Sequence, residues 1–453
     1  MTRLYNGVRL LGQGPSIKNI QKLDAGAIPF ISECMKTGMM IDPSHVERME
    51  VELTRDMERI TEEVKQLTGH YVNLASGDQV SELLFKKLKL HQARYKMTKS
   101  GDRESVEDEV LTAIQHDHPV VPKILEYKEF DKLRGTYVRP IPKLSRDNGS
   151  GVPRLFPNLS ATRVPSGRLS CKSPNLLAMP TRTERGRDIR KGFIAPAGWS
   201  YVSIDESQIE VRLAAHSSGD PNLIRVFEND EDIYSDFAIT AFGLKDTRFR
   251  DEYGKWHYPG VDKNDHRFPS KTCILASIYD VTAKGLLEQM PTIYINGKPK
   301  WSEEGTQRLI TAFYLRYPGI MEDRKRHHRM ARRYGYVWDM WGRFLHCAAV
   351  RSVLPWVVSG ALREVGNFPY QSGAQGTIKL TMAETHDTWE DGGLSEVVKP
   401  QLQIHDELLY IVRDDMIEEW TEYVKGVFEH CVPLRVPIKA GGAAAKDWGS
   451  LDK

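Results

Sequence analysis

Apolar residues recur at spacings of three and four between residues 42 and 69, which predicts one amphipathic helix. Pro43 suits an early helical position, and Gly69 is a stop signal. On periodicity alone, a solvated helix of a bundle is favoured over a partner-binding coil. The positions expected to face the core are Val46, Met49, Leu53, Met57, Ile60, Val64 and Leu67. Further helices are predicted at residues 25–38, 104–133, 308–333, 375–390 and 416–432.

Two other stretches are typical of strands that end in acids. The first is rich in Tyr, Val and Ile, ends at Asp205, and is followed by a helix for which Ser207 is the expected N-cap. The second, at 402–412, places a polar His-Asp-Glu triplet between two apolar runs, which predicts a tight hairpin with its acids at the tip. If the fold brings Asp205 and Asp406 together, they can hold divalent metal ions that activate an attacking oxygen and stabilise a leaving one.

Composition excludes several classes of protein. The 453 residues allow two to four domains or one large enzyme with several subdomains, and 40% hydrophobic with 27% charged residues is ordinary for a soluble globular protein. A net charge of +2 argues against a uniformly basic nucleic-acid coat but permits local basic patches. The five scattered cysteines form no CxxC pair, which favours a reducing compartment over a disulfide framework or a zinc site. No stretch has the apolar length that spans a membrane.

Basic residues are concentrated in two segments. The first grips phosphates in one interpretation and is a plain solvated loop in the other, and the residues alone leave both open. The second precedes the Asp205 strand, and so many cations beside acids suggest a polyanion laid across the site. The cations are Lys86, Lys87, Lys89, Arg94, Lys96, Lys99 and Arg103 in the first segment and Arg163, Arg168, Arg182, Arg185, Arg187, Arg190 and Lys191 in the second.

Four residues at a spacing of four define one stripe of a predicted helix: Arg267, Lys271, Leu275 and Tyr279. Two cations one turn apart can grip a triphosphate, and the ring of Tyr279 can lie under a base. Cations at this spacing are also common on exposed helices, which is the simpler interpretation of the stripe taken alone.

Together these motifs resemble those of family A DNA polymerases. Asp205-Glu-Ser-Gln-Ile-Glu-Val-Arg resembles motif A, Arg267-x3-Lys271-x7-Tyr279 resembles motif B, and His405-Asp406-Glu407 resembles motif C. Each motif is moderately specific, whereas all of them in this order are highly specific. Three more segments also fit in order and spacing, namely Gly167-Arg168-Leu-Ser, Asn367-x-Pro-x-Gln371 and Asn73-x-x-Ser76-x-x-Gln79.

The resemblance implies an α+β, right-hand polymerase fold with an antiparallel-sheet palm and a mostly helical thumb and fingers. It implies template-directed addition of deoxynucleotides to a primer 3′ end by two-metal nucleotidyl transfer. The implied divisions are an N-terminal segment at 1–24, a thumb at 25–140, a palm at 141–228 and 376–453, and fingers at 229–375.

The resemblance also implies the roles of individual residues. Asp205 and Asp406 would hold two Mg²⁺ ions, for which Mn²⁺ can substitute, with the backbone carbonyl of Glu206 in a metal shell and Glu407 as a supporting acid. Lys271 and Arg267 would grip the triphosphate, and Lys271 would also stabilise charge in the transition state. Glu210, helped by Tyr279, would crowd the sugar 2′ position and exclude ribonucleotides. Further nucleotide contacts are implied for Gln208, Tyr234 and Leu275, and DNA contacts for Arg168, Gln371, His405, Asn73, Ser76 and Gln79.

Four residues depart from the family pattern, and the loop at 244–266 is longer than usual. Glu206 stands where the family usually has Tyr, and Tyr234 where many members have a phosphate-contacting His. Leu275 replaces the usual Phe or Tyr, and Asp280 replaces the Gly after the motif B tyrosine. Leu275 is found mainly among phage-like members, which implies a phage-like origin.

About 24 residues precede the implied thumb, so neither a 3′–5′ nor a 5′ nuclease domain is expected. The implied partners are primer-template DNA and deoxynucleoside triphosphates, with a separate exonuclease, helicase or primase as further candidates. A cytoplasmic location without membrane association is expected. Two alternatives stay open. Glu210 and Glu407 argue against a single-subunit RNA polymerase, and a non-catalytic DNA-binding clamp is expected to have lost Asp205, Asp406 or Lys271.

Overall fold

The computed structural model describes residues 14–90, 97, 98, 101, 103–147, 149, 151–181, 183–291, 294, 295 and 298–451. The chain divides into two compact units. Unit 1 comprises Met1–Glu33, Ser160–Ser170 and Val202–Ala443, and unit 2 comprises Cys34–Leu159, Cys171–Tyr201 and Ala444–Lys453. Helix α2 (Ile17–Thr37) and strands β4 (Asn158–Ser160), β5 (Ser170–Lys172), β6 (Trp199–Glu206) and β15 (Ala440–Ala445) pass from one unit to the other.

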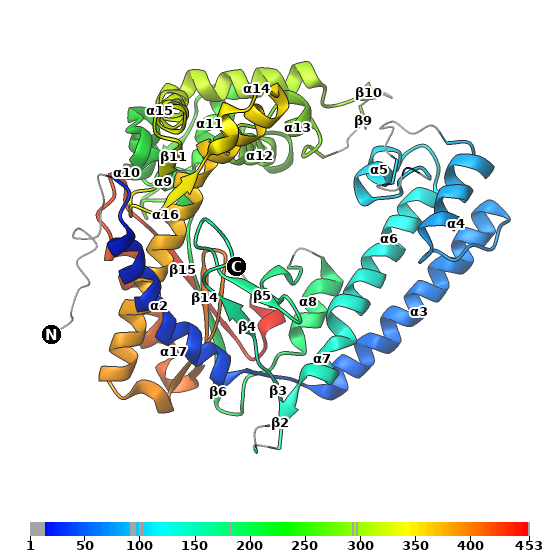
Figure 1. Cartoon of the computed structure of the whole chain (residues 1–453), viewed down its shortest axis with the longest axis horizontal. Helices are drawn as coiled ribbons and strands as arrows, with labels where there is room; N and C mark the ends of the chain where they lie inside the picture. Colours follow the sequence, from blue (N-terminus) through cyan, green and yellow to red (C-terminus); the bar gives the residue numbers. More distant parts are fainter. Residues whose placement is uncertain are drawn as a thin grey trace. The chain divides into compact units, whose positions relative to one another are not determined.

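Unit 2 is built around α3 (Pro43–Thr68), which runs beside α6 (Val120–Leu133) (Figure 1). The Asp42 side chain caps α3 by accepting a hydrogen bond from the backbone N–H of His45, and Gly69 ends the helix at φ 70°. Six of the seven positions expected to face the core are buried, which confirms the predicted periodicity. Leu67 is the exception at 44% exposed, because it lies in the last turn of the helix.

The other elements of unit 2 are short. Its three-stranded sheet has the order β1-β3-β2 and is antiparallel. The remaining bounds are β1 (Met39–Met40), α4 (Gly77–Ser81), η1 (Glu82–Lys87), α5 (Asp108–Ala113), η2 (Arg134–Val138), α7 (Pro140–Leu144), β2 (Arg146–Asp147), β3 (Pro153–Leu155), η3 (Leu176–Ala178), α8 (Glu184–Lys191) and η8 (Trp448–Ser450).

The main sheet has the strand order β13-β14-β6-β15 (Figure 1). Strands β13 (Val398–Ile404) and β14 (Glu407–Arg413) form the predicted hairpin, in which Ile404 lies opposite Glu407. A two-residue turn, His405-Asp406, therefore connects them, and His405 adopts φ 52° to close it. Both faces of this hairpin are buried. Strand β14 is apolar from Leu408 to Val412, whereas β13 also buries the polar side chains of Gln401 and Gln403.

Helices make up most of the rest of unit 1. A buried cluster that includes Phe237, Ile274 and Phe313 joins α11, α12 and α14. The bounds are α9 (Ile209–Ser218), α10 (Pro221–Glu228), α11 (Ile233–Ala241), β7 (Phe249–Arg250), β8 (Trp256–His257), η4 (Lys263–Arg267), α12 (Phe268–Ile278), α13 (Ala283–Leu287), β9 (Tyr294–Ile295), β10 (Lys298–Pro299), α14 (Glu303–Arg316), α15 (Pro318–Tyr334), β11 (Tyr336–Trp338), β12 (Phe344–His346), η5 (Ala348–Arg351), α16 (Pro355–Asp391), η6 (Leu394–Glu396), η7 (Asp414–Met416) and α17 (Ile417–His430).

Helix α16 corrects the largest error in the predicted elements. It begins at Pro355, not at residue 375, and continues through Pro369. A proline inside a helix removes one backbone hydrogen bond and normally ends the pattern. Here Val365, Phe368 and Tyr370 are buried around that turn, and their packing keeps the helix continuous.

Four smaller predictions about helix boundaries were also wrong. Helix α2 begins at Ile17 rather than residue 25, and the pattern at 104–133 is divided between α5 and α6. The pattern at 308–333 is interrupted because Tyr317 leaves the helical conformation before Pro318, with φ −127° and ψ 67°. Ser207 is not an N-cap: α9 starts after Gln208, whose φ is 57° and whose side chain makes no capping bond.

All five cysteines are free and buried. In the described part of the chain, no helix combines the length and apolar character needed to cross a membrane.

Candidate active site

The ends of two neighbouring strands bring the predicted metal-binding acids together. The backbone N–H of Glu206, at the end of β6, donates to the carbonyl of Asp406 in the β13–β14 turn at 3.0 Å. Asp205 and Asp406 are both half-buried. Strand β15 passes Asp205 at Gly441, where even an added Cβ would lie 3.5 Å from Oδ1. The strand order thus brings the backbones of Asp205 and Asp406 to adjoining strand ends, and at Gly441 strand β15 presents no side chain to Asp205.

Two further acids lie beside this pair. Glu206 is 3% exposed, and within the described part of the chain neither of its carboxylate oxygens has a hydrogen-bond partner. Burial, together with the charge of Asp406, raises the pKa of Glu206 well above its usual value. Glu407 is also buried and accepts a hydrogen bond of 2.5 Å from the Ser203 hydroxyl. The Glu206 side chain is therefore enclosed by the protein. Only the backbone carbonyl of Glu206 is suited to the predicted role as a metal ligand.

A second cluster joins three residues that are far apart in the sequence. Glu210, in the first turn of α9, accepts hydrogen bonds from Arg168 Nη2 at 2.5 Å and from the Tyr279 hydroxyl. Burial raises the pKa of Glu210 to about 7, although the positive charge of Arg168 acts in the opposite direction. The charge of Asp406 also contributes to this increase.

The raised pKa of Glu210 predicts a pH-dependent cost to stability. In the folded state Glu210 stays protonated up to about pH 7, whereas in the unfolded chain it ionises near its usual pKa of 4.5. Protonation of Glu210 therefore stabilises the folded state at low pH, and this stabilisation is lost as the pH rises through 7. The unfolding free energy of the wild type should therefore fall relative to that of Glu210→Gln, by about 2 kcal/mol between about pH 5 and about pH 8. Chemical denaturation of both proteins without DNA or metal measures this difference, and a constant difference across that range would contradict it.

Helix α12 carries the predicted triphosphate stripe. Arg267 directly precedes the helix, Lys271 lies in it, and Tyr279 follows its last residue. The Tyr234 ring lies against both cations, with Arg267 Cζ at 5.2 Å and Lys271 Nζ at 5.7 Å from the ring centre. Tyr234 is 4% exposed, so its ring packs against the two cations from the protein interior. The stripe is thus formed, and its cationic end is held against an aromatic side chain.

The backbone conformation and the contacts of Asp280 explain why Asp can stand after the motif B tyrosine, where the family pattern has Gly. It has φ 58°, a conformation that Asp tolerates better than most residues, and it accepts a hydrogen bond of 2.7 Å from Arg324 Nη1. Arg324 is 5% exposed and also donates to the carbonyl of Ser277 near the end of α12. Asp280 therefore completes a bridge between α15 and the end of α12.

Replacing this residue should destabilise the protein. Asp280→Ala is expected to lower the unfolding free energy by about 2 kcal/mol, since Ala is strained at positive φ and Arg324 loses a partner. Asp280→Asn, which tolerates the same φ and keeps an acceptor, is expected to lose less than half as much. Thermal unfolding of the two variants compares them, and equal losses would contradict the backbone part of this explanation.

Other predicted nucleotide and DNA contacts lie at varied depths in unit 1. Leu275 is half-buried against the cluster beneath α12. Gln208 is half-buried, and its Oε1 has no hydrogen-bond partner among the residues that the structure describes. Gln371 lies half-buried on α16, one turn after Asn367, whose amide donates to the carbonyl of Tyr279 at 3.5 Å. His405 is exposed at the hairpin turn.

Three predicted DNA contacts lie in unit 2. The Ser76 hydroxyl caps α4 by accepting a hydrogen bond from the N–H of Gln79, and Gln79 Oε1 accepts one from the N–H of Asn73. Asn73 and Gln79 are exposed. Of the predicted basic positions, Arg94, Lys96, Lys99 and Arg182 lie outside the described residues.

The carboxylate pair fits a magnesium site in its donor chemistry. Asp205 and Asp406 offer hard oxygen ligands, and Mg²⁺ usually takes one or two carboxylates together with substrate phosphates and water. Among the described residues, no group of three or more His, Cys, Asp or Glu side chains is placed to hold a metal ion. Any ion here would therefore be bound by the two carboxylates, backbone oxygens and the substrate.

A sequence profile of DNA polymerase family A matches residues 43–450. The chain belongs to DNA polymerase family A. It is 33% identical over 412 residues to thermostable DNA polymerase I of Thermus caldophilus, covering 91% of this chain and 46% of that protein. DNA polymerase I of Chloroflexus aurantiacus is 28% identical over 445 residues, with 96% and 44% covered. The chain spans about half the length of the curated relatives it matches.

A solved structure supports the same assignment. The POL domain of Pol1 from M. smegmatis, in complex with DNA primer-template and dNTP, matches with a TM-score of 0.81 at 26% identity. The match covers 93% of this chain and 70% of that one. The predicted α+β polymerase fold with an antiparallel sheet is thereby confirmed.

Some contacts that support the site of this family A chain were not predicted. Gly167 has φ 77°, and a Cβ there would lie 2.8 Å from the Arg343 guanidinium, so only glycine fits before Arg168. Arg343 and the fully buried Lys379 both pair with Asp24 Oδ1, at 2.5 and 2.7 Å. The sequence offered Gly167 as a signal, but nothing marked Asp24.

Proposed function

We propose that this chain is a template-directed DNA polymerase that extends a primer 3′ end with deoxynucleotides by two-metal nucleotidyl transfer. The observation that carries the proposal is the backbone bond between Glu206 and Asp406, which sets the two motif acids at adjoining strand ends. Family membership supports the same reaction, as does the similarity to the M. smegmatis domain, which was solved with primer-template DNA and dNTP.

Asp205 and Asp406, with the Glu206 carbonyl, would hold two Mg²⁺ ions, for which Mn²⁺ can substitute. When bound, such ions lower the pKa of an attacking hydroxyl and stabilise charge on the phosphate oxygens. Arg267 and Lys271 hold the triphosphate and offset its negative charge. Tyr234 supports both cations from behind. Glu407, fixed by Ser203, adds negative potential beside the pair.

Glu210 is proposed as the sugar gate. Its carboxyl group is fixed by Arg168 and Tyr279, so it cannot easily swing away from a ribonucleotide 2′ hydroxyl. Gln208 and Leu275 are proposed to line the nucleotide site, and Arg168, Gln371 and His405 to contact the minor-groove edge at the primer end. The degenerate minor-groove pattern suits a check of base-pair geometry rather than of sequence.

The finer assignments are part of the same proposal. We assign the thumb to 25–140, the palm to 141–228 and 376–453, and the fingers to 229–375, with Asn73, Ser76 and Gln79 as thumb contacts to DNA. Primer-template DNA and deoxynucleoside triphosphates are the proposed partners. A phage-like origin, a cytoplasmic location and a separate exonuclease, helicase or primase stay predictions.

A primer-extension assay tests the proposal. The full chain is incubated with a primed single-stranded template, Mg²⁺ and four deoxynucleotides, in parallel with a chelator control and a ribonucleotide control. Extension that needs Mg²⁺ and deoxynucleotides is expected. Extension with ribonucleotides at a comparable rate would favour an RNA polymerase, and primer-template binding without any extension would favour a DNA-binding clamp.

A further inference from the structure

The residues between α11 and α12 form a compact folded segment rather than an open loop. Strands β7 and β8 pair as a short hairpin, with Phe249 opposite His257 and their rings stacked at 5.0 Å. Asp251 closes the hairpin turn by accepting hydrogen bonds from the N–H groups of Tyr253 and Lys255, and from His257 Nε2 at 2.7 Å. We call residues 244–266 the hairpin segment.

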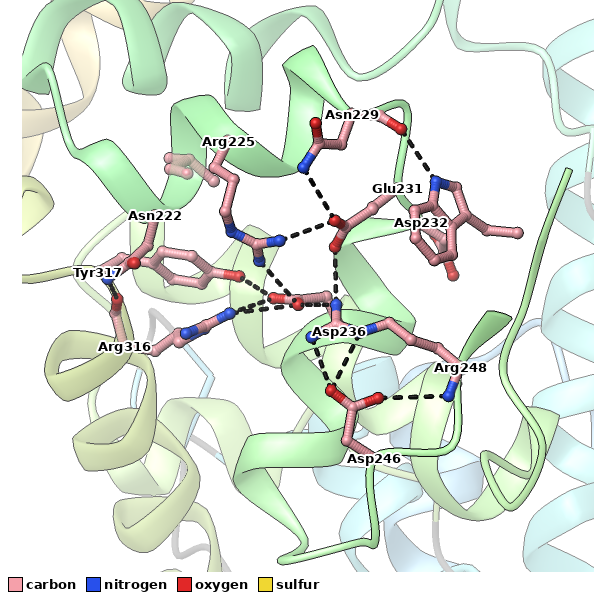
Figure 2. A network of polar contacts seen from close by, with 12 residues as sticks. Asn222, Arg225, Asn229, Glu231, Asp232, Asp236, Asp246, Arg248, Arg316 and Tyr317 are labelled. Carbon is pink, nitrogen blue, oxygen red and sulfur yellow. Dashed lines mark hydrogen bonds and ion pairs between the residues drawn. The ribbon is translucent and has the colours of Figure 1, made fainter. Parts of the chain in front are cut away.

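Arg248 anchors the hairpin segment in a buried charge cluster (Figure 2). Its Nη1 donates to Glu231 at 2.7 Å and to Asp236 at 2.6 Å, and both carboxylates are buried. Arg225 pairs with both acids, Arg316 pairs with Asp236, and Asp246 pairs with Arg248. Burial opposes ionisation of Asp236, but the Arg316 charge and hydrogen bonds from Arg248 and Arg316 outweigh it and lower the pKa. Three arginines thus balance three acids.

Two aromatic residues of the hairpin segment bind the backbone just before α11. Trp256 Nε1 donates to the carbonyl of Asn229 at 2.9 Å. The Tyr258 hydroxyl accepts from the N–H of Asp232 at 2.8 Å. The segment therefore fixes the short connection between α10 and α11 at both of its ends.

Asp232 connects this attachment to the triphosphate grip. Its carboxylate caps α11 through Ser235 and accepts two hydrogen bonds from Arg267, from Nε at 2.8 Å and from Nη2 at 3.1 Å. Among the residues that the structure describes, Asp232 is the only hydrogen-bond partner of this guanidinium. Asp232 therefore holds one edge of Arg267, against the Tyr234 ring, and leaves Nη1 for a phosphate oxygen.

We propose that the hairpin segment positions Arg267 for the triphosphate, through Tyr258 and Asp232. The proposal rests on the proposed function of α12 as the triphosphate grip. Tyr258 fixes the backbone of Asp232, and Asp232 fixes the orientation of the guanidinium before nucleotide arrives. A cation held in its binding orientation loses less conformational freedom on binding, which increases affinity for the phosphates. Tyr258 and Asp232 are positioning residues, because they act through Arg267.

Removing the Tyr258 hydroxyl tests this assignment with the smallest change. In single-nucleotide incorporation, Tyr258→Phe is expected to raise the KM for the deoxynucleotide about threefold to tenfold, since the N–H of Asp232 loses its partner. The change in kcat is expected to stay within about twofold, because the missing contact serves binding in ground and transition state alike. Inhibition by pyrophosphate should weaken by the same factor as KM rises. Discrimination against ribonucleotides should stay unchanged, since Glu210 lies at the sugar.

Two more variants keep the test decisive. Tyr253→Phe is the matched control, because Tyr253 lies in the same segment but is 88% exposed, and its kinetics should equal those of the wild type. Trp256→Phe removes the second attachment and should raise KM in the same direction. An unchanged KM in Tyr258→Phe at wild-type melting temperature, or equal changes in Tyr253→Phe, would overturn the proposal.

The same inference can be separated from polymerase activity. Calorimetric titration of pyrophosphate onto the full chain reports the cationic grip without any primer extension. If the wild type fails to extend primers, the proposed function fails, while weaker pyrophosphate binding by Tyr258→Phe would still support the positioning role. Equal pyrophosphate binding by Tyr258→Phe and the wild type would overturn it in either case.

Discussion

Asp406→Asn is expected to lose nucleotide incorporation by about a thousandfold or more, because one of two carboxylates at the adjoining strand ends is replaced by a weak neutral ligand. Asn keeps the size of the side chain and suits a tight turn, so the β13–β14 hairpin should persist. The Glu206 N–H donates to a backbone oxygen of residue 406, which the substitution retains. Single-turnover incorporation from a preformed primer-template complex measures the loss without a contribution from product release.

Asp415→Asn is the matched control for this experiment. Asp415 follows the same hairpin, is 61% exposed in its side chain and pairs with Arg413 at the surface. Its incorporation rate should equal that of the wild type, because a surface ion pair of this kind contributes little. Loss of primer-template binding together with activity in Asp406→Asn would point to a misfolded hairpin instead. Retained activity in Asp406→Asn would show that this acid is not a metal ligand.

Glu210→Ala is expected to admit ribonucleotides, with the preference for deoxynucleotides falling about a hundredfold, the factor that ~3 kcal/mol of lost exclusion gives. The physical reason is steric, since Arg168 and Tyr279 hold the Glu210 carboxyl in place. The change should appear in the ratio of kcat/KM for the two sugars, measured opposite the same template base. Deoxynucleotide incorporation should change much less than ribonucleotide incorporation.

Glu228→Ala provides the comparison, because Glu228 is an exposed acid at the end of α10. It should leave the preference between sugars unchanged. If Glu210→Ala keeps the wild-type preference, the gate role is excluded, and the Arg168–Glu210–Tyr279 cluster would then serve only to hold α9 and α12 together.

Much of the site could be predicted because its parts are local in sequence. The stripe from Arg267 to Tyr279 needs only helical spacing, and the His405-Asp406 turn needs only two apolar runs around a polar triplet. Such patterns determine which residues share a face or a turn. That Asp205 and Asp406 lie together was expected from the family resemblance, and the strand order supplies the physical reason.

Other features depend on contacts between distant residues and left no local pattern. Asp24 meets Arg343 across 319 positions, and Asp232 meets Arg267 across 35 positions. Helix α16 continues through Pro369 because buried neighbours stabilise it, which composition alone cannot show. The hairpin segment looked like a polar insertion, since its charged residues are balanced by partners such as Asp236 that lie outside it.

The most direct test of the central claim is single-nucleotide incorporation by the wild-type chain on four templates that differ only in the base opposite the insertion site. Each template is offered each of the four deoxynucleoside triphosphates separately, with Mg²⁺. If the chain is a template-directed polymerase, rapid incorporation occurs only for the four complementary pairs. Incorporation that ignores the template base would contradict templated synthesis, and no incorporation on any template would contradict the assignment of the carboxylate pair as a catalytic metal site.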